Sequence, residues 1–279
     1  MGGMTIDALT VAAERSEAAM MMALESRAEP ETARRLGIDA AEIGGGVVLA
    51  VRDDPSEYWS KTYCLGLATP ITDAIVGQVL DFYRDNGNKS AVLQIAPAAL
   101  PPDWAEICGR HGLAEGTSWH KLVRDVDGEW PSAETSLRIA PVGLADRVSW
   151  ARTVMRGFGM PEELAPMISN VLAEEGVTSF GAYEDGELVG SGTLAVVDVA
   201  GGRRVGQLAA GMTLSDHRGR GGQSALIATR LRAAIEAGAE LLVAETGDEK
   251  PGEHNTSLHN LLRFGFRVLY KRQNWLWRA

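Results

Sequence analysis

The sequence predicts an α/β (α+β) protein built as two similar domains in which helices and strands alternate. A length of 279 residues suits two ordinary domains. Residues 125–136, DVDGEWPSAETS, cluster Gly, Pro, Ser and acidic residues without periodicity, as linkers do. Both halves also end alike, because RHGL at residues 110–113 and RFGF at residues 263–266 each follow a helical pattern and precede a predicted hairpin of strands. We therefore expect domains at residues 1–124 and 137–279.

The first half shows a shortened version of the element pattern of the second. In the first half we expect helices at residues 7–27, 72–85 and 102–110, and strands at residues 47–52, 63–67 and 91–95. In the second half we expect strands at residues 137–142, 177–183, 187–197, 203–214, 240–245, 266–270 and 274–277, and helices at residues 143–157, 161–175, 221–237 and 257–263. Asp185-Gly186 predicts a tight hairpin turn. Five residues give the helix at 221–237 its apolar face: Leu226, Ile227, Leu231, Ala234 and Ile235.

The composition argues against nucleic-acid, membrane and metal-binding roles. A net charge of −10 offers no counterion-release energy to a nucleic acid. The apolar run at residues 18–24 is too short for a membrane span or signal peptide, and Glu17 and Glu25 flank it, so we expect a cytoplasmic protein. Cys64 and Cys108 lack metal-ligand spacing and are expected to be reduced and buried. No two of the five histidines are spaced i, i+4, so we expect no metal.

The segment at residues 212–226, MTLSDHRGRGGQSAL, combines features of an anion-binding loop. A predicted strand leads into it and a long helix follows, so unpaired N–H groups of the first helical turn face the loop. Arg218 and Arg220 add positive charge. Three glycines allow close backbone approach to a ligand: Gly219, Gly221 and Gly222. The sequence fits neither a Walker loop nor a dinucleotide fingerprint, and the alternative is a plain strand-to-helix turn with surface arginines.

The order of elements and this loop together resemble the GNAT acetyltransferase superfamily. The loop of that family reads Arg/Gln-x-x-Gly-x-Gly/Ala, and residues 218–223, RGRGGQ, match its first four positions. Gln223 departs at the last position, so its side chain must turn away from the pyrophosphate. Asn255, Ser257, Asn260 and residues 263–266 resemble the Asn…Ser/Ala…Gly-Phe segment of the family, which lies along the pantetheine and adenosine.

The resemblance implies two GNAT-like domains, each a mixed, mostly antiparallel sheet flanked by helices, with a degenerate first domain. It also implies acetyl-CoA as acyl donor. The residues that would bind the donor are Met212, Thr213, Leu214, Arg218, Gly219, Arg220, Gly221, Gly222, Gln223, Ser224, Asn255 and Asn260.

In the family, the strand before the loop carries a bulge and splays from its neighbour to admit the pantetheine. Here the strands would be residues 203–214 and 240–245, and a backbone N–H near Gly211 or Met212 would polarise the thioester carbonyl. Gly211 is expected to form the kink, because Ala209 and Ala210 carry a Cβ. A bulge without a catalytic part is the alternative.

Two catalytic candidates follow from the same resemblance, Glu245 and Ser257. Glu245 would act as base at the end of its strand, and the alternative is a cap or salt bridge there. The usual acid of the family, a Tyr four residues before the Gly-Phe pair, is replaced by Leu261. Ser257 or Tyr270 could substitute, although a thiolate is a tolerable leaving group without help.

The acceptor would lie over the helix pair at residues 143–175. Apolar residues of that pair would line its pocket or simply form core: Trp150, Met155, Phe158, Met160 and Met167. The first half has no Gly/Arg cradle at residues 65–74. Pro70 removes a donor there, and Asp73 in the first helical turn would repel a pyrophosphate. We expect this half to bind no coenzyme A and to cover the sheet edge or shape the acceptor site.

The resulting expectation is an N-acetyltransferase in which a small-molecule amine attacks acetyl-CoA directly in a ternary complex. The alternative is a non-catalytic acyl-CoA-binding or sensor protein, which Leu261 keeps open. A purely structural tandem domain is a third possibility, and the intact Gly/Arg loop argues against it. We expect no nucleic-acid or membrane partner, and a monomer or homodimer.

Overall fold

The computed structural model describes residues 6–199 and 201–279. The first half contains α1 (Ala8–Ser26), α2 (Pro30–Leu36), β1 (Ile38–Ile43), β2 (Gly46–Val51), β3 (Lys61–Tyr63), α3 (Asp73–Asp85), β4 (Ser90–Gln94), the 3₁₀ turn η1 (Pro97–Ala99), α4 (Trp104–His111) and β5 (Ala114–Asp125). The second half contains β6 (Arg138–Pro141), η2 (Leu144–Asp146), α5 (Arg147–Gly157), η3 (Glu162–Leu164), α6 (Ala165–Ser169), η4 (Asn170–Ala173), β7 (Val177–Glu184), β8 (Glu187–Val199), β9 (Arg203–Thr213), η5 (Ser215–His217), α7 (Gly222–Glu236), β10 (Leu241–Gly247), α8 (Thr256–Arg263) and β11 (Arg267–Arg278).

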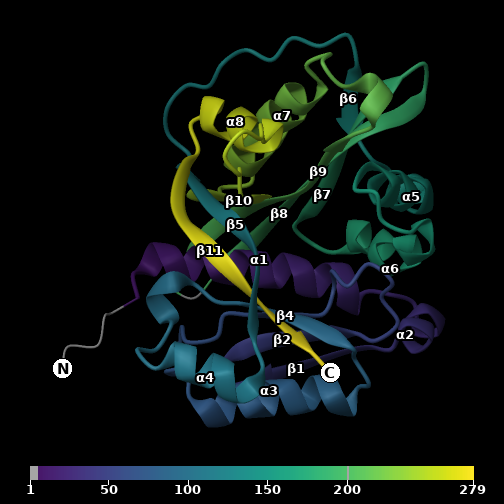
Figure 1. Cartoon of the computed structure of the whole chain (residues 1–279). Coiled ribbons are helices and arrows are strands. Elements are labelled where there is room, and N and C mark those ends of the chain that lie inside the picture. The colour runs from purple at the N-terminus through teal and green to yellow at the C-terminus, as the bar shows by residue number, and fades with distance from the viewer. Residues whose placement is uncertain (1–5, 200) are drawn as a thin grey trace.

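One mixed sheet of eleven strands crosses both halves, in the order β1-β2-β3-β4-β11-β5-β10-β9-β8-β7-β6. Neighbouring strands run antiparallel except for the parallel pairs β3–β4 and β10–β9. Helices cover both faces of the sheet, and α1 lies across the middle of the molecule (Figure 1). The expected class, a mostly antiparallel mixed sheet flanked by helices, is confirmed. No helix of residues 6–199 and 201–279 is both long and apolar enough to span a membrane.

The two halves exchange their final strands. β5, from the first half, pairs with β10, and β11, from the second half, lies between β4 and β5. Figure 1 shows β11, in yellow, running from beside α8 down to the C-terminus next to β4. The hairpins expected near residues 113–124 and 266–277 are therefore wrong, since each segment is one long strand. Bulges interrupt the β11–β5 register between Val268 and Tyr270 and between Gln273 and Trp275.

Other expected elements need local corrections. The strand predicted at residues 63–67 ends at Tyr63, because Cys64 adopts a positive φ of 63°. The helix predicted at residues 161–175 is three short pieces, η3, α6 and η4. The prediction omitted α2, which has Pro30 at its first turn and the left-handed Gly37 as its C-cap, and β1. Residues 126–137, in the predicted linker region, carry no helix or strand.

Alternation along the central strands assigns the helices to opposite faces. Val205 and Val243 pack with Ala12 and Ala13 of α1. On the opposite face, the next residues of the same strands, such as Leu242, pack against α7 and α8. α1 also packs on Leu49 and Tyr63 of the first half, so this single helix covers strands of both halves. Helix α1 therefore covers one face of the sheet in both halves.

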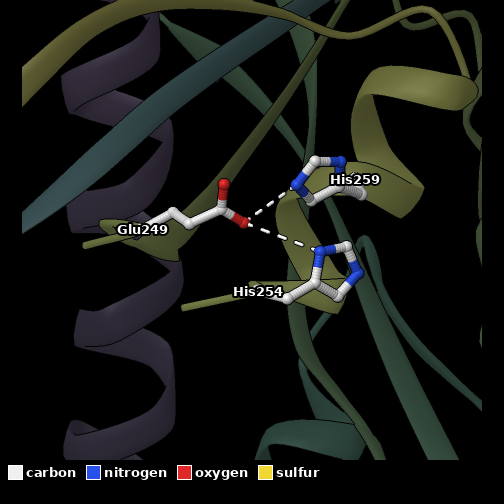
Figure 2. Close-up of side chains that lie close together, drawn as sticks. All are labelled: Glu249, His254 and His259. Atoms are coloured by element: carbon white, nitrogen blue, oxygen red, sulfur yellow. Dashed lines mark hydrogen bonds and ion pairs between the residues drawn. The ribbon is translucent and has the colours of Figure 1, made fainter. Parts of the chain in front are cut away.

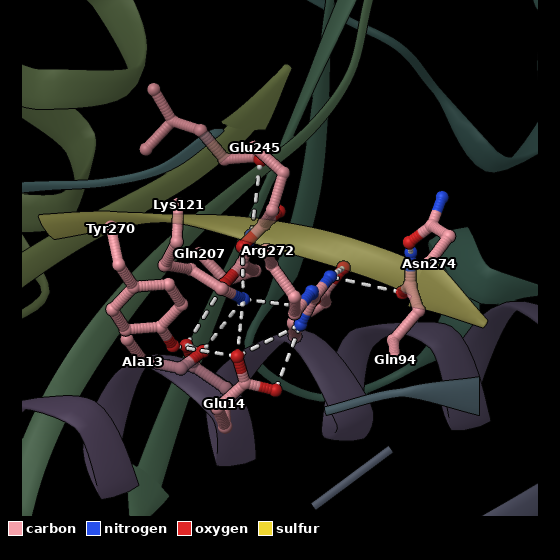
Figure 3. A network of polar contacts seen from close by, with 12 residues as sticks. Ala13, Glu14, Gln94, Lys121, Gln207, Glu245, Tyr270, Arg272 and Asn274 are labelled. Atoms are coloured by element: carbon pink, nitrogen blue, oxygen red, sulfur yellow. Dashed lines mark hydrogen bonds and ion pairs between the residues drawn. The ribbon is translucent and has the colours of Figure 1, made fainter. Parts of the chain in front are cut away.

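A buried ionic cluster lies between α1 and the sheet (Figure 3). Arg272 of β11 is 1% exposed, and its guanidinium donates to Glu14 at 2.8 and 2.9 Å and to Glu17 at 2.7 and 2.9 Å. It also donates to the amide oxygen of Gln94 on β4 at 2.9 Å. Lys121 of β5 pairs with Glu17 at 2.5 Å and with Glu245 of β10 at 2.8 Å. The cluster thus joins α1 to four strands that come from both halves.

We expect Arg272→Met to lower the free energy of unfolding by about 3 to 5 kcal/mol, because it leaves Glu14 and Glu17 buried with one cation fewer. Urea unfolding at pH 7, followed by circular dichroism, measures the change. Arg278→Met on the same strand is the matched control, because Arg278 and its partner Glu57 are 61% and 50% exposed. The control should change stability by less than about 0.5 kcal/mol. Equal losses in the two variants would show that the cluster does not hold β11 in place.

Candidate functional site

A cavity of about 1140 Å³ runs from the start of α7 to α1 and the α5–α6 region. On the way it passes residues 207–213 of β9 and 244–247 of β10. Both halves of the chain contribute to its wall, and its lining mixes apolar side chains with a small number of charged groups. Cavities of this size and composition are typical of small-molecule sites.

The loop before α7 leaves the start of that helix open. Gly219 and Gly221 adopt positive φ angles of 76° and 77°, which a side chain would disfavour. Gly221 is the N-cap residue of α7; no side chain caps the helix there, and its first turn carries no acidic residue. The first N–H groups of α7, a helix of 15 residues, therefore have no side-chain cap, and this end of the helix favours an anion.

Ten of the twelve residues expected to bind the donor line the cavity; the exceptions are Leu214 and Arg220. The side chain of Arg220 instead forms an ion pair with Glu184 at the end of β7. Gln223 donates from its side-chain amide to the hydroxyl of Thr213 at 3.0 Å, so its side chain is turned back toward β9. Asn255 is the N-cap of α8 and accepts from the N–H of Leu258 at 3.1 Å, which gives it a structural task as well.

β9 contains the bulge that the resemblance implied. Its pairing with β8 shifts between Ser191, which faces Met212, and Thr193, which faces Ala209. The residue with left-handed backbone is Ala210, at φ 47°. The expectation that Gly211 forms the kink was therefore wrong: Gly211 shares the bulge with Ala210, opposite Gly192, but Ala210 is the residue that takes the left-handed conformation.

The strands β9 and β10 separate beside this bulge. Their parallel pairing covers Val205–Leu208 and Leu241–Ala244 and stops there, although both strands continue. Backbone groups of β9 beyond Leu208 consequently have no strand partner on the β10 side. The opening lies where a chain-like ligand could pass between the two strands, along the edge of β9 that β10 no longer pairs.

Glu245 lies at the start of this opening and is held by two neighbours. Lys121 donates to one carboxylate oxygen at 2.8 Å, and the side-chain amide of Gln207 donates to the other at 2.8 Å. Burial, with the nearby negative charge of Glu17, raises the pKa of Glu245 to about 7 despite the charge of Lys121. The alternative of a salt bridge is thus realised, and the same carboxyl still titrates near neutral pH.

Glu17 behaves in the opposite way within the same cluster. Burial alone would raise its pKa, but Arg272 and Lys121 outweigh burial and lower the pKa of Glu17 to about 2. Three carboxylates, Glu14, Glu17 and Glu245, share two cations here. Of the three carboxylates, Glu245 is the one whose negative charge the two cations compensate least.

The candidate acids lie in different surroundings. Ser257 lines the cavity from the first turn of α8, where it is exposed, and Leu261 lines it one turn later. Tyr270 lies outside the lining, and its hydroxyl donates to Glu14 at 2.6 Å in the ionic cluster. Burial raises the pKa of Tyr270 well above its ordinary value. Tyr270 is therefore part of the cluster and cannot serve as an acid in the cavity.

The expected acceptor residues divide into two groups. Met155, Phe158 and Met160 line the cavity. Trp150 and Met167 are fully buried core residues, and the indole N–H of Trp150 donates to Ser191 at 2.8 Å. For those two, the alternative of plain core holds.

The sequence reasoning did not identify Arg230 of α7, which is 3% exposed and lines the cavity. Its guanidinium donates to the carbonyls of Thr193 at 3.5 Å and Ala209 at 3.3 Å, on the two strands that form the bulge. Burial lowers its pKa to about 10, so it is charged at neutral pH. Its spacing of four from Leu226 places it on the apolar helix face, which is the signal that could have identified it.

Glu249, His254 and His259 meet beside α8 (Figure 2). His259 Nε2 is 2.8 Å and His254 Nδ1 is 4.0 Å from Glu249 Oε2, and the two rings stack with centroids 4.3 Å apart. The i, i+4 spacing rule for histidines missed this pair because His254 precedes α8. The ligand atoms lie within 4.8 Å of one another, so this group could hold a divalent cation or form an ion pair. That the protein uses no metal stays a prediction.

Comparison with known proteins connects this geometry to one family. Residues 146–266 match the acetyltransferase (GNAT) family, while no curated protein matches the chain significantly. A GCN5-related N-acetyltransferase from Kribbella flavida is 20% identical, with a TM-score of 0.62 and coverage of 94% of both chains. A GCN5-related N-acetyltransferase from Sphaerobacter thermophilus is 15% identical, with a TM-score of 0.59 over 95% of this chain and 91% of that one.

A tandem GNAT protein from the clavulanic acid biosynthesis pathway shares the fold across both halves. It is 13% identical, with a TM-score of 0.59 over 95% of this chain and 96% of that one. At these identities the solved structures show the fold alone. The expected resemblance to the GNAT superfamily is confirmed for residues 146–266, and the fold of the whole chain resembles that of a tandem GNAT protein. That the first half is a degenerate GNAT-like domain stays a prediction.

Proposed function

We propose that this chain, whose residues 146–266 form an acetyltransferase (GNAT) family domain, transfers an acetyl group from acetyl-CoA to the amine of a small molecule. One observation carries the proposal. A single cavity joins the uncapped start of α7, the opening between β9 and β10, and a buried carboxyl that titrates near pH 7. These are an anion site, a passage for a chain-like donor, and a base.

The donor site follows from the loop and the opened strands. The uncapped N–H groups of α7 and the guanidinium of Arg218, which lines the cavity, favour the pyrophosphate of acetyl-CoA. The opening beyond Leu208 and Ala244 would accept the pantetheine arm. A free N–H of residues 210–212 would then donate to the thioester carbonyl as negative charge develops on its oxygen.

Arg230 reinforces this part of the site. By donating to carbonyls on both bulged strands it fixes the backbone that carries the free N–H groups. Its positive charge has no carboxylate partner within the described residues, so it adds positive potential beside the bulge. Burying a cation of this kind costs folding free energy. Its presence is explained if it stabilises negative charge that develops in the site during the reaction.

Glu245 is the proposed base, and the amine attacks directly in the ternary complex. The nitrogen forms a bond to the acetyl carbonyl carbon, its proton passes to Glu245 directly or through water, and the carbon–sulfur bond breaks. Coenzyme A leaves as a thiolate, which tolerates the replacement of the usual tyrosine by Leu261. Ser257, exposed in the first turn of α8, is the proposed hydrogen-bond donor that stabilises the leaving thiolate, which then takes a proton from water.

The test is thiol release from acetyl-CoA by the purified chain with a panel of amines, together with mass spectrometry of the products. Amine-dependent thiol release with an acetylated amine supports the proposal. Tight acetyl-CoA binding without turnover of any amine would contradict it and favour an acyl-CoA-binding or sensor protein, for which Leu261 is the supporting observation.

We expect Gly219→Asp to weaken acetyl-CoA binding at least tenfold, because it places a carboxylate beside the proposed pyrophosphate site. Gly201→Asp is the matched control. Both glycines have positive φ, at 76° and 95°, and a Cβ on either would meet no heavy atom of the described chain within 4 Å. Gly221 is unsuitable, since its Cβ would lie 2.1 Å from the carbonyl oxygen of Glu134. Calorimetry measures both affinities, and equal Kd values in the two variants would refute this placement of the pyrophosphate.

We expect kcat/KM to fall by an additional factor of about ten per pH unit below a midpoint near 7, beyond the fall set by protonation of the amine, because Glu245 accepts a proton only when ionised. Glu245→Gln should remove this step and lower kcat about 10²- to 10⁴-fold, while the limb set by ionisation of the amine itself persists. Glu240→Gln, at an exposed position just before β10, is the control and should keep the wild-type profile. A step near pH 7 that survives in Glu245→Gln would show that another group is the base.

A further inference from the structure

The acceptor end of the cavity is built largely by the first half of the chain. Met20, Met21 and Leu24 of α1 line it, as do Tyr58 and Trp59 of the β2–β3 loop and Trp119 of β5. They face the lining residues of the second half's helix pair, such as Met155 and Phe158. Met and aromatic side chains on both walls offer a large apolar contact surface to a ligand.

These first-half side chains are held in place by backbone contacts. The carboxylate of Asp54 accepts the N–H groups of Tyr58 at 2.7 Å and Trp59 at 2.8 Å, which fixes the loop that carries both rings. Trp119 lies on β5 opposite Gly247 of β10, next to the opening between β9 and β10. The apolar wall therefore begins close to where the acetyl group would arrive.

Charged groups on this side of the cavity are few and of one sign. Asp248, next to Gly247 and Trp119, lines it and is paired with Lys271, which does not. Glu17 and Glu245 also line it, whereas their cations Lys121 and Arg272 do not. Because three carboxylates share those two cations, the cluster attracts one further positive charge at Glu245. An ammonium group that binds there is placed beside the proposed base.

The cavity offers no similar binding partner to a second charged group on the acceptor. Lys61 is buried outside the lining, its ammonium lies 3.2 Å from the centre of the Tyr58 ring, and burial lowers its pKa to about 7. Glu25 is 1% exposed, lies outside the lining, and burial raises its pKa well above the ordinary value, which favours the neutral acid. Within the described residues, the first-half wall thus presents no free cation to a carboxylate, and its one ionised carboxylate, Glu17, is already paired with Lys121 and Arg272.

We infer that the acceptor is a primary amine on an apolar aliphatic or aromatic body, without a carboxylate, a phosphate or a second ammonium. This rests on the proposed acetyl transfer and names the substrate class of the same site. The apolar body would lie between α1, the Tyr58–Trp59 loop and the α5–α6 region, with its amine at Glu245. A charged substituent on the body would be desolvated without a partner.

The test compares matched pairs of amines with acetyl-CoA and the full chain. 2-Phenylethylamine is paired with phenylalanine, which adds a carboxylate, and hexylamine with 1,6-diaminohexane, which adds an ammonium. We expect kcat/KM for the apolar member to exceed that of its charged partner at least tenfold in each pair.

A variant pair tests the same wall. Met21, half-buried on α1, is replaced by Glu or by the uncharged Gln of similar size. Met21→Glu should raise the ratio of 1,6-diaminohexane to hexylamine turnover at least threefold relative to Met21→Gln, because the new carboxylate pairs with the distal ammonium. Circular dichroism and acetyl-CoA affinity, expected to be unchanged, report that both variants are folded.

The outcomes separate this inference from the proposed function. A charged amine that is acetylated as fast as its apolar partner, or a ratio that is equal in the two Met21 variants, overturns the acceptor class and leaves acetyl transfer standing. If no amine is acetylated, the proposed function fails. The inference is then decided by calorimetry with the CoA-saturated chain, where tighter binding of 2-phenylethylamine than of phenylalanine supports it and the reverse order overturns it.

Discussion

The pairing of Arg272 with Glu14 and Glu17 is the interaction on which the rest of the molecule depends. A buried guanidinium is tolerable only with its anions in place, so α1 can cover β11 only where Arg272 meets Glu14 and Glu17. The same guanidinium contacts Gln94 on β4, which brings the first half into the cluster. Because Lys121 extends the cluster to Glu245, the charges that hold the two halves together also set the ionisation of the proposed base.

A second constraint maintains the opening beside the base. The bulge at Ala210 places a residue with a Cβ in left-handed backbone, which costs of order 1 to 3 kcal/mol and must be held by its surroundings. Arg230 does this by bonding to carbonyls on both β8 and β9. The pairing of β9 with β8 and its pairing with β10 are thus interrupted at the same height in the sheet. Backbone polar groups that would bond to a neighbouring strand in a regular sheet remain available to a ligand there.

Local patterns in the sequence predicted the parts of the fold that local forces decide. The Gly/Arg loop and α7 follow from glycine freedom and apolar periodicity, and the Asp185-Gly186 turn follows from its two positive φ angles. The strand exchange could not be predicted in this way, because the polar residues 271–273 read as a turn until the partners of Arg272 on α1 are known. The position of the kink was missed for the same reason, since the register with β8 and not the glycine determines it. Tyr58, Trp59 and Trp119 line a cavity that both halves form, which no local pattern encodes.

The exchange of final strands also has a consequence for biosynthesis. Gln94 of β4 and its partner Asn274 of β11 are 180 residues apart in the chain. At about 5 to 20 residues per second, a ribosome needs about 10 to 40 seconds to make the intervening segment. During that time β4 and β5 both present an unpaired edge, and α1 carries two carboxylates whose guanidinium has not yet been synthesised. The first half therefore cannot complete its sheet until β11 has been synthesised, and contacts this distant in the chain are expected to form slowly.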